Sequence, residues 1–551
     1  MSRSLRTALA LLALGACSPE RLERAVATSP PPDYPAALDP IRLGFLPADT
    51  AAFGDRQRDA LYLARLLWAH YPDKAGTELD GAFVERSAAF IREAAGLPPG
   101  DAFAWQVHLQ YYLAALDDGH THARVVYGTA DDPWYDLDLA VPPGTDELVV
   151  LAVDSSLDAR MLGGTAVGVG GVHAREVLAA ADRYHEGENP HRARYLLGRY
   201  AHLPRYWRAL GLAADDSLTL RVATPDGDTL VGTLRPGVVY DPRVVATDTT
   251  VFPFARRQPT AYFTQFLPEF SAAYLQANTL LDWTAMRPEI DDYVAWPLRS
   301  AARAAARKRK RAEGAVDFGE VLQRFFARVE ADSLRRVVLD LRYNGGGDER
   351  LGRQFAYYLA TPDSLRGGEV YYRFDDYLAA VVPGDYRRFR AAFAKTHGRT
   401  PGPDEWVAID EQVLREGFWQ AIDAPGSPFF LDSTIAKFDG EVYVLIGPQT
   451  SSAAALLAAV LQDNDLATVV GSPSGNRPGG PTGASTIELP HTGALVALSY
   501  LYVERADASR AHETAVIPDV YAPPTRTSVL RGRDPALEAA LGIGRGRLPG
   551  G

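Results

Sequence analysis

Apolar residues recur at three- and four-residue spacing through the first quarter of the chain. The repeat is clearest at 55–71 and 101–116, where polar side chains separate the apolar positions. Such a period places the apolar side chains on one face of an α-helix. The pattern therefore predicts a small helical domain over 49–130, which ends abruptly at a turn around Gly119.

The pattern then changes to short apolar runs that are separated by glycine-containing turns. Residues 147–154, 164–172 and 217–234 carry apolar side chains in the way of half-buried strands, and the last run contains the hairpin-turn sequence Pro-Asp-Gly. We expect a small β-rich domain over 131–245, with a helical insertion at about 174–212.

Strands and helices alternate from 255 to 530, which is typical of a layered α/β domain. The predicted strands are 272–278, 337–343, 442–447 and 467–471, and the predicted helices are 348–360 and 451–463. A segment rich in aromatic and charged residues interrupts the alternation at 362–436. We expect it to be a helical insertion that can roof a site, and residues 531–551 to be a C-terminal tail.

Length and charge limit the possible functions. The chain has 551 residues, 47% of them hydrophobic, and a formal net charge of −12. It can bury large cores in roughly two to four domains. The acidic balance argues against nucleic acid as a partner, and the basic run at 307–311 is expected to be a solvated helix face or loop.

The N-terminus resembles that of a bacterial lipoprotein. Arg3 and Arg6 precede an apolar segment at 8–14, and the next residues are Gly15-Ala16-Cys17, with the only cysteine of the chain. The apolar segment is too short to span a bilayer. We expect 1–16 to be a signal peptide, Cys17 to carry a lipid anchor in the cell envelope, and 17–48 to be a linker; an ordinary secretory signal is the alternative.

A candidate nucleophile lies between a predicted strand and a predicted helix. The strand ends at Gly447-Pro448, and Thr450, Ser451 and Ser452 follow at the start of the helix. The N–H groups and the dipole of a helix N-terminus are suited to stabilising an oxyanion. The plain alternative is that one of these hydroxyls only caps the helix.

Two other segments carry candidate chemistry. Residues 337–348 run from a strand into three glycines, but they lack the spacing of nucleotide-binding loops, so a binding loop and a plain turn both remain open. His120 and His122 follow the helical domain. A general base, a structural histidine and a metal ligand are all compatible with this pattern, although no third ligand stands at a convincing spacing.

Four motifs give the chain a family resemblance. VVLDLRYNGGGD, TSSAA, VVGSPSGNRP and IPDV occur in the order found in the tail-specific, or carboxyl-terminal processing, serine proteases. The sequence most resembles the branch with the tricorn protease core and the interphotoreceptor retinoid-binding repeats. The resemblance implies a crotonase/ClpP-like α/β core, and a PDZ-like domain at 131–245.

The resemblance also implies roles for individual residues. Ser452 matches the nucleophile, and the N–H groups of Ala453 and Gly346 match the oxyanion hole. His120 matches the general base, and Glu513 matches the carboxylate that supports it, with Glu504 as a rival. A family lysine is replaced by Arg477, which stays protonated and cannot act as a base, so a Ser/Lys dyad is not expected.

The resulting prediction is a serine endopeptidase that needs no cofactor or metal and acts on envelope or unfolded proteins. The alternative is a catalytically weak or inactive relative that acts as a ligand-binding or scaffold lipoprotein. An esterase is a third possibility, but Ser452 has no Gly-x-Ser-x-Gly surroundings.

Overall fold

The computed structural model describes most of the chain beyond the N-terminal segment. The described residues are 38–74, 79–128, 132–185, 187–213, 216–238, 242–245, 252–282, 317–361, 364–402, 405–409, 413 and 436–543. Cys17, the expected signal peptide and the basic run at 307–311 lie outside them. No helix within the described ranges is long and apolar enough to cross a membrane.

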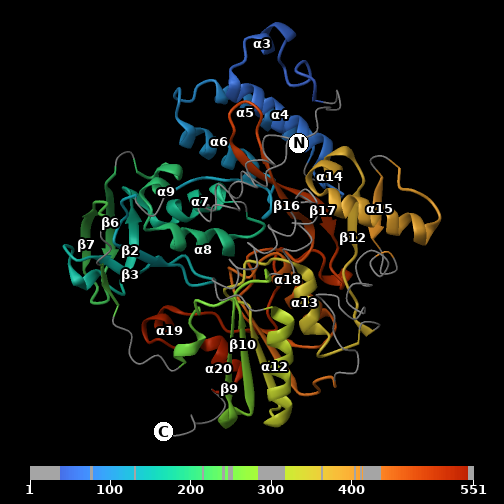
Figure 1. Ribbon diagram of the computed structural model, residues 1–551. Coiled ribbons are helices and arrows are strands. Elements are labelled where there is room, and N and C mark those ends of the chain that lie inside the picture. Colours follow the sequence, from blue (N-terminus) through green and yellow to red (C-terminus); the bar gives the residue numbers. More distant parts are fainter. Residues whose placement is uncertain are drawn as a thin grey trace, which may run out of the picture.

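Helices form the top of the molecule in Figure 1, as the periodicity predicted. They are α3 (Pro47–Ala51), α4 (Asp55–His70), α5 (Gly81–Ala94) and α6 (Ala102–Ala114). Asp80 and Asp101 set the starts of α5 and α6, because each carboxylate accepts a hydrogen bond from the N–H group three residues later. The apolar faces of the helices pack on Ile487, Val496 and Leu498, so this region shares a core with later strands.

A sheet with seven strands lies at the left in Figure 1. Its strands are β2 (Leu137–Ala140), β3 (Val149–Asp154), β4 (Thr165–Val169), β5 (Val172–His173), β6 (Leu218–Ala223), β7 (Thr229–Leu234) and β8 (Pro242–Val244). The main order is β2-β3-β4-β6-β7, and the antiparallel β6–β7 hairpin turns at the expected Pro-Asp-Gly sequence, where Gly227 has φ +93°. The expected helical insertion consists of α7 (Ala174–Tyr184), α8 (Pro190–Tyr200) and α9 (Pro204–Ala209).

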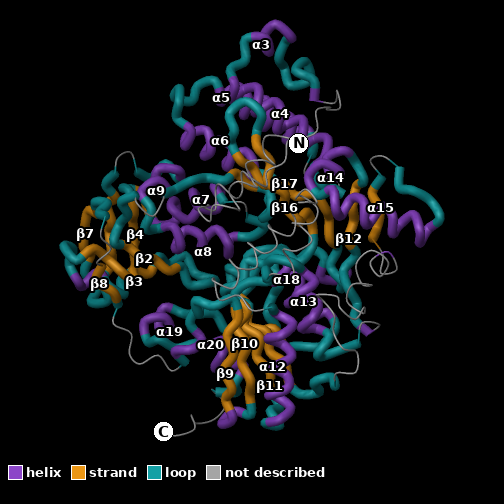
Figure 2. Tube along the Cα trace, in the orientation of Figure 1, coloured by secondary structure: helices purple, strands orange, loops and turns teal. Residues whose placement is uncertain are grey.

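The central α/β layer contains a sheet of six strands, shown in orange at the bottom of Figure 2. In sheet order they are β18 (Val520–Tyr521), β15 (Thr468–Gly471), β14 (Glu441–Ile446), β11 (Arg336–Asp340), β10 (Ala272–Ala277) and β9 (Tyr262–Leu267). All neighbouring pairs are parallel except β9–β10.

Both faces of this sheet are buried, because successive side chains of a strand point to opposite sides. Val337 and Leu339 join the core that contains α12 (Phe318–Ala331), α13 (Glu349–Ala356) and α18 (Ala453–Asp463). Val338, between them, joins the opposite core with α20 (Pro535–Ala540). The predicted layered α/β fold is thereby confirmed.

The third sheet corrects one expectation. Its strands are β1 (His122–Ala123), β12 (Val370–Arg373), β13 (Trp406–Ile409), β16 (Gly480–Glu488) and β17 (Leu495–Val503). The segment 362–436 is therefore not only helical: besides α14 (Asp376–Val381) and α15 (Pro383–His397), it supplies β12 and β13, which extend β17 through antiparallel pairing. Val370 and Tyr372 alternate with less buried residues, so four residues suffice to bury one face of the strand.

Candidate active site

The turn between β14 and α18 holds Ser452 in an unusual backbone conformation. Ser452 has φ 52° and ψ −131°, and it directly precedes the first residue of α18. A non-glycine residue rarely adopts this conformation, which costs on the order of 1–3 kcal/mol. Its hydroxyl makes no capping bond to the helix, so the plain capping alternative does not apply to Ser452.

The two neighbouring hydroxyls are engaged in structural hydrogen bonds. Thr450 Oγ1 donates to the carbonyl oxygen of Leu341 at 2.9 Å. Ser451 Oγ donates to the carbonyl oxygen of Gln449 at 3.1 Å and accepts a bond from Arg192 at 2.8 Å. These bonds shape the turn, whereas the Ser452 hydroxyl has no hydrogen-bond partner among the described residues and lines a pocket.

The triple-glycine loop lies against the Ser452 turn. A Cβ atom on Gly346 would lie 2.6 Å from Ser452 Cβ, and Gly346 has φ +102°, so only glycine fits there. The Gly346 N–H, however, donates to Asn344 Oδ1 at 2.8 Å. This bond occupies the group expected in the oxyanion hole. Gly347, the next residue, lines the pocket, and its N–H has no partner among the described residues.

Ala453, whose N–H group is expected in the oxyanion hole, lies directly after Ser452. It is the first residue of α18, and it lines the same pocket as Ser452. N–H groups in the first turn of a helix have no intrahelical acceptor. The Ala453 N–H also makes no bond to another described residue.

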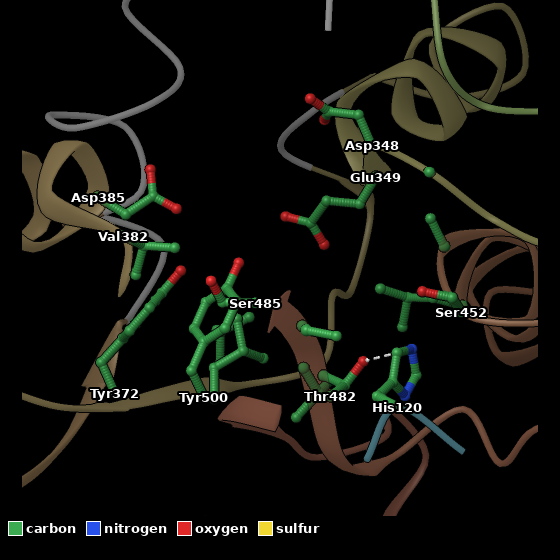
Figure 3. Close-up of a pocket in the computed structure, with 18 of the residues that line it drawn as sticks. His120, Asp348, Glu349, Tyr372, Val382, Asp385, Ser452, Thr482, Ser485 and Tyr500 are labelled. Atoms are coloured by element: carbon green, nitrogen blue, oxygen red, sulfur yellow. Dashed lines mark hydrogen bonds between the residues drawn. The ribbon is translucent and has the colours of Figure 1, made fainter. Parts of the chain in front are cut away.

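His120 lies on the turn between α6 and β1 and lines the pocket with Ser452. Its Nε2 is hydrogen-bonded to Thr482 Oγ1 at 3.2 Å, and its Nδ1 lies 3.8 Å from Asp118 Oδ1 (Figure 3 draws the first contact). The fully buried Asp118 carboxylate also accepts bonds from the His120 backbone N–H at 2.9 Å and from Ser499 Oγ at 2.7 Å. These bonds fix Asp118 beside the imidazole.

A second carboxylate reaches the histidine from the segment before α8. Glu188 accepts a bond from the Gly119 N–H at 3.1 Å and one from the Arg477 N–H. One donor atom each from Asp118, His120 and Glu188 lie within 4.8 Å of one another, an arrangement that could hold a cation. Burial raises the pKa of Glu188 to about 7, although the neighbouring Arg477 opposes this shift.

His122 does not join this group of three. Burial, followed by the charges of Arg124 and Arg192, lowers its pKa to about 3. The His122 ring is therefore neutral at ordinary pH, and it does not line the Ser452 pocket.

The structure does not bring Glu513 or its rival Glu504 to His120. Glu513 pairs with Arg505 at 2.6 Å, and Arg505 also binds Asp463, the last residue of α18. Ser452 precedes the other end of this 11-residue helix, roughly 16 Å away. Glu504 pairs instead with Lys74 at 2.6 Å.

Sequence reasoning thus missed the two carboxylates that lie next to His120. Asp118 stands two residues before the histidine, and this spacing allows an aspartate to bond the backbone two residues ahead, so a local signal was present. Glu188 belongs to a segment without a motif and lies 69 residues from its bonding partner Gly119. No local pattern pointed to it.

The pocket that contains Ser452 and His120 continues into the third sheet and the insertion. Its volume is about 450 Å³, within the usual range of ligand sites. Figure 3 shows Ser452 and His120 at one end, and Tyr372, Val382 and Asp385 at the other. Val382 and Asp385 belong to the segment that was expected to roof a site.

Part of the chain matches the model of a known protein family. Residues 311–522 match the model of peptidase family S41, a stretch that includes the triple-glycine loop and Ser452. No curated protein matches the chain.

Solved structures are similar to the chain over most of its length. The crystal structure of mature CPAF has a TM-score of 0.54 and 15% identity, and the alignment covers 88% of this chain and 95% of that one. Mature CPAF complexed with lactacystin gives 0.54 and 15%, with 89% and 97% covered. For the photosystem II D1 C-terminal processing protease the TM-score is 0.38 and the identity 16%, and the alignment covers 88% of this chain and 99% of that one. At such identities the likeness to CPAF concerns the fold.

Proposed function

We propose a catalytic mechanism for this chain, which belongs to peptidase family S41 through its residues 311–522 and is a serine peptidase. The family agrees with the resemblance of the four sequence motifs. In the proposal, Ser452 is the nucleophile and His120 the general base for the hydrolysis of peptide bonds in unfolded or cell-envelope proteins.

The chief support is the Ser452 turn. Its hydroxyl is not used in a capping bond, the backbone holds it at a helix N-terminus, and it shares a pocket with a histidine from a distant part of the chain. Ser452 Oγ attacks the peptide carbonyl while His120 Nε2 takes its proton. The imidazolium then donates this proton to the leaving amine. In the second half of the reaction, water attacks the acyl-enzyme while His120 Nε2 takes a proton from it, and the imidazolium returns this proton to Ser452 Oγ.

Two carboxylates stabilise the imidazolium in this mechanism, in place of Glu513. Asp118 faces Nδ1 at 3.8 Å and orients the ring, and Glu188 adds negative charge nearby. A negative charge close to the ring favours its charged form. The oxyanion receives hydrogen bonds from the Ala453 N–H and from the Gly347 N–H, which takes the role first expected of Gly346.

The test is labelling by a fluorophosphonate probe together with hydrolysis of an unfolded protein such as casein. Ser452→Ala should abolish both, and His120→Ala should lower both by at least about a thousandfold, in keeping with the loss of a general base and nucleophile activation. Ser451→Ala is the matched control, because it removes the adjacent hydroxyl and should leave labelling at Ser452 detectable. Labelling or hydrolysis that persists in Ser452→Ala refutes the assignment, and a wild-type chain that never reacts supports the binding-protein alternative.

The lipid anchor at Cys17 is a separate proposal. The apolar segment and the Leu-Gly-Ala-Cys sequence support it, and they imply attachment to a bacterial envelope membrane. Metabolic labelling with a palmitate analogue should mark the wild-type chain and not Cys17→Ala. An unlabelled wild-type chain would refute the anchor without affecting the catalytic proposal.

A further inference from the structure

The pocket extends well beyond the two catalytic side chains and is large enough for a substrate side chain. Its lining includes aromatic and aliphatic residues from the third sheet, from α15 and from the position just before α15, namely Tyr372, Val382, Phe389, Tyr500 and Leu501. Such a wall suits a long side chain with an apolar stem.

Three carboxylates and three guanidinium groups line the pocket, and each guanidinium has a carboxylate partner other than Glu349. Asp348 forms an ion pair with Arg350, and Asp385 pairs with Arg388 at 3.1 Å. Arg477 lies 3.6 Å from Glu188, just outside the lining. Each of these three cations thus has a carboxylate beside it.

Glu349 is the remaining carboxylate of the lining. The charge of Arg350 acts on it, but the Arg350 guanidinium is bound to Asp348. Glu349 is the first residue of α13, and it has no ion pair or hydrogen bond with another described residue. Figure 3 shows its side chain extending into the pocket, between Ser452 on one side and Tyr372 and Asp385 on the other. A neutral substrate side chain would enclose this carboxylate without a partner, which is unfavourable.

We infer that Glu349 makes the peptidase select substrates with a lysine or arginine side chain next to the bond that is cleaved. The aliphatic stem packs against Tyr372 and Phe389, and the cationic head binds the Glu349 carboxylate. A charge-assisted bond in a partly closed pocket supplies both attraction and direction. The inference rests on the proposed function, because it assigns the substrate side chain at the same site.

The experiment uses the full chain and maps cleavage sites in an unfolded protein digest by mass spectrometry. Wild type should cut mainly beside Lys or Arg, at one fixed position relative to the bond. Peptides that differ only by Lys or norleucine at that position then give kcat/KM values. Glu349→Gln should lower the value for the Lys peptide roughly tenfold or more. It should not lower the value for the norleucine peptide, because the neutral side chain no longer encloses an unpaired carboxylate.

Two further variants make the result specific. Glu349→Lys should shift the preference toward Asp or Glu at the same position. Glu320→Gln is the matched control, since Glu320 is an exposed glutamate in the first turn of α12 and has no side-chain partner among the described residues. It should behave as wild type.

The outcomes separate this inference from the proposed function. If wild type shows no enrichment of Lys or Arg, or if Glu349→Gln keeps the wild-type ratio of the two peptides, the role of Glu349 is overturned. Cleavage that depends on Ser452 in the same samples would leave the catalytic proposal intact. Cleavage that survives Ser452→Ala would instead overturn the catalytic proposal.

Discussion

Glu188 offers the sharpest test of the site, because removal of its charge should change the pH dependence of stability and that of activity in opposite directions. Its side chain is 1% exposed, and its oxygens accept the N–H groups of Gly119 and Arg477. We expect Glu188→Gln to keep the shape and one acceptor oxygen while removing the charge.

The size of the stability effect follows from the raised pKa. Burial raises the pKa of Glu188 from 4.5 to about 7, so between these values the folded chain binds more protons than the unfolded chain. The stability that protonated Glu188 contributes is fully present below about pH 4.5 and is lost as the pH rises through 7. Each pH unit corresponds to about 1.36 kcal/mol, so the loss is about 3 kcal/mol.

Removal of the charge should therefore make Glu188→Gln relatively more stable as the pH rises. The difference in free energy of unfolding between Glu188→Gln and wild type should shift by about 3 kcal/mol in favour of the variant between pH 4.5 and pH 8. Chemical denaturation at a series of pH values measures this change. Glu320→Gln, an exposed control, should show no such pH-dependent difference.

Activity should change in the other direction. The Glu188 oxygen and the His120 nitrogen lie within 4.8 Å, where opposite charges attract by about 3 kcal/mol at an effective dielectric constant of about 20. At pH 8 the kcat/KM of Glu188→Gln should be lower than that of wild type by tenfold or more, and the gap should narrow toward pH 5.5. Parallel pH profiles of stability and activity in the two proteins would refute the assignment of a buried, titrating carboxylate beside His120.

Other predictions concern the same pocket. In Gly119→Ala the new Cβ would lie 1.8 Å from Asn476 Nδ2. This clash should abolish most of the casein hydrolysis and lower the free energy of unfolding by about 1–3 kcal/mol. The double variant Gly119→Ala/Asn476→Ala should recover part of both the activity and the stability. No recovery would contradict the clash. Thr482→Val removes the bond that holds His120 Nε2, so fluorophosphonate labelling of Ser452 should accelerate about two- to tenfold; slower labelling would mean that Thr482 orients the histidine for catalysis.

The parts of the molecule that the sequence predicted well are those with a local pattern. The strand β14, the turn at Gly447 and the helix α18 follow one another within about twenty residues, and apolar periodicity and turn residues identify each of them. The same holds for the strand before the triple glycine and for the helices α4 and α6. The family match at 311–522 covers the motifs from which the resemblance was first drawn.

The parts that could not be predicted depend on contacts between distant segments. Glu513 was chosen because it precedes the Pro-Asp motif, and its spacing gave no sign that Arg505 would hold it at the far end of α18. Gly346 was chosen within a run of identical residues, and only the bond from its N–H to Asn344 separates it from Gly347. The strands β12 and β13 have four residues each, too few for a period to be recognised inside a charged segment.

The segment around the start of α8 lies outside residues 311–522, the stretch that matches the family model, but it contacts the proposed catalytic site. Asn189 donates to the carbonyl oxygens of Ser474 and Thr514, and Arg192 donates to Ser451 beside the nucleophile. Glu188 also accepts a hydrogen bond from the Gly119 N–H. Together these bonds connect the region of the seven-stranded sheet to both segments that carry the proposed catalytic residues. His120 and Ser452 come from segments more than three hundred residues apart, so only contacts between distant parts of the chain, such as these hydrogen bonds, fix their relative position. The segment at the start of α8 therefore holds hydrogen bonds to the histidine turn, through Glu188 and Gly119, and to the serine turn, through Arg192 and Ser451.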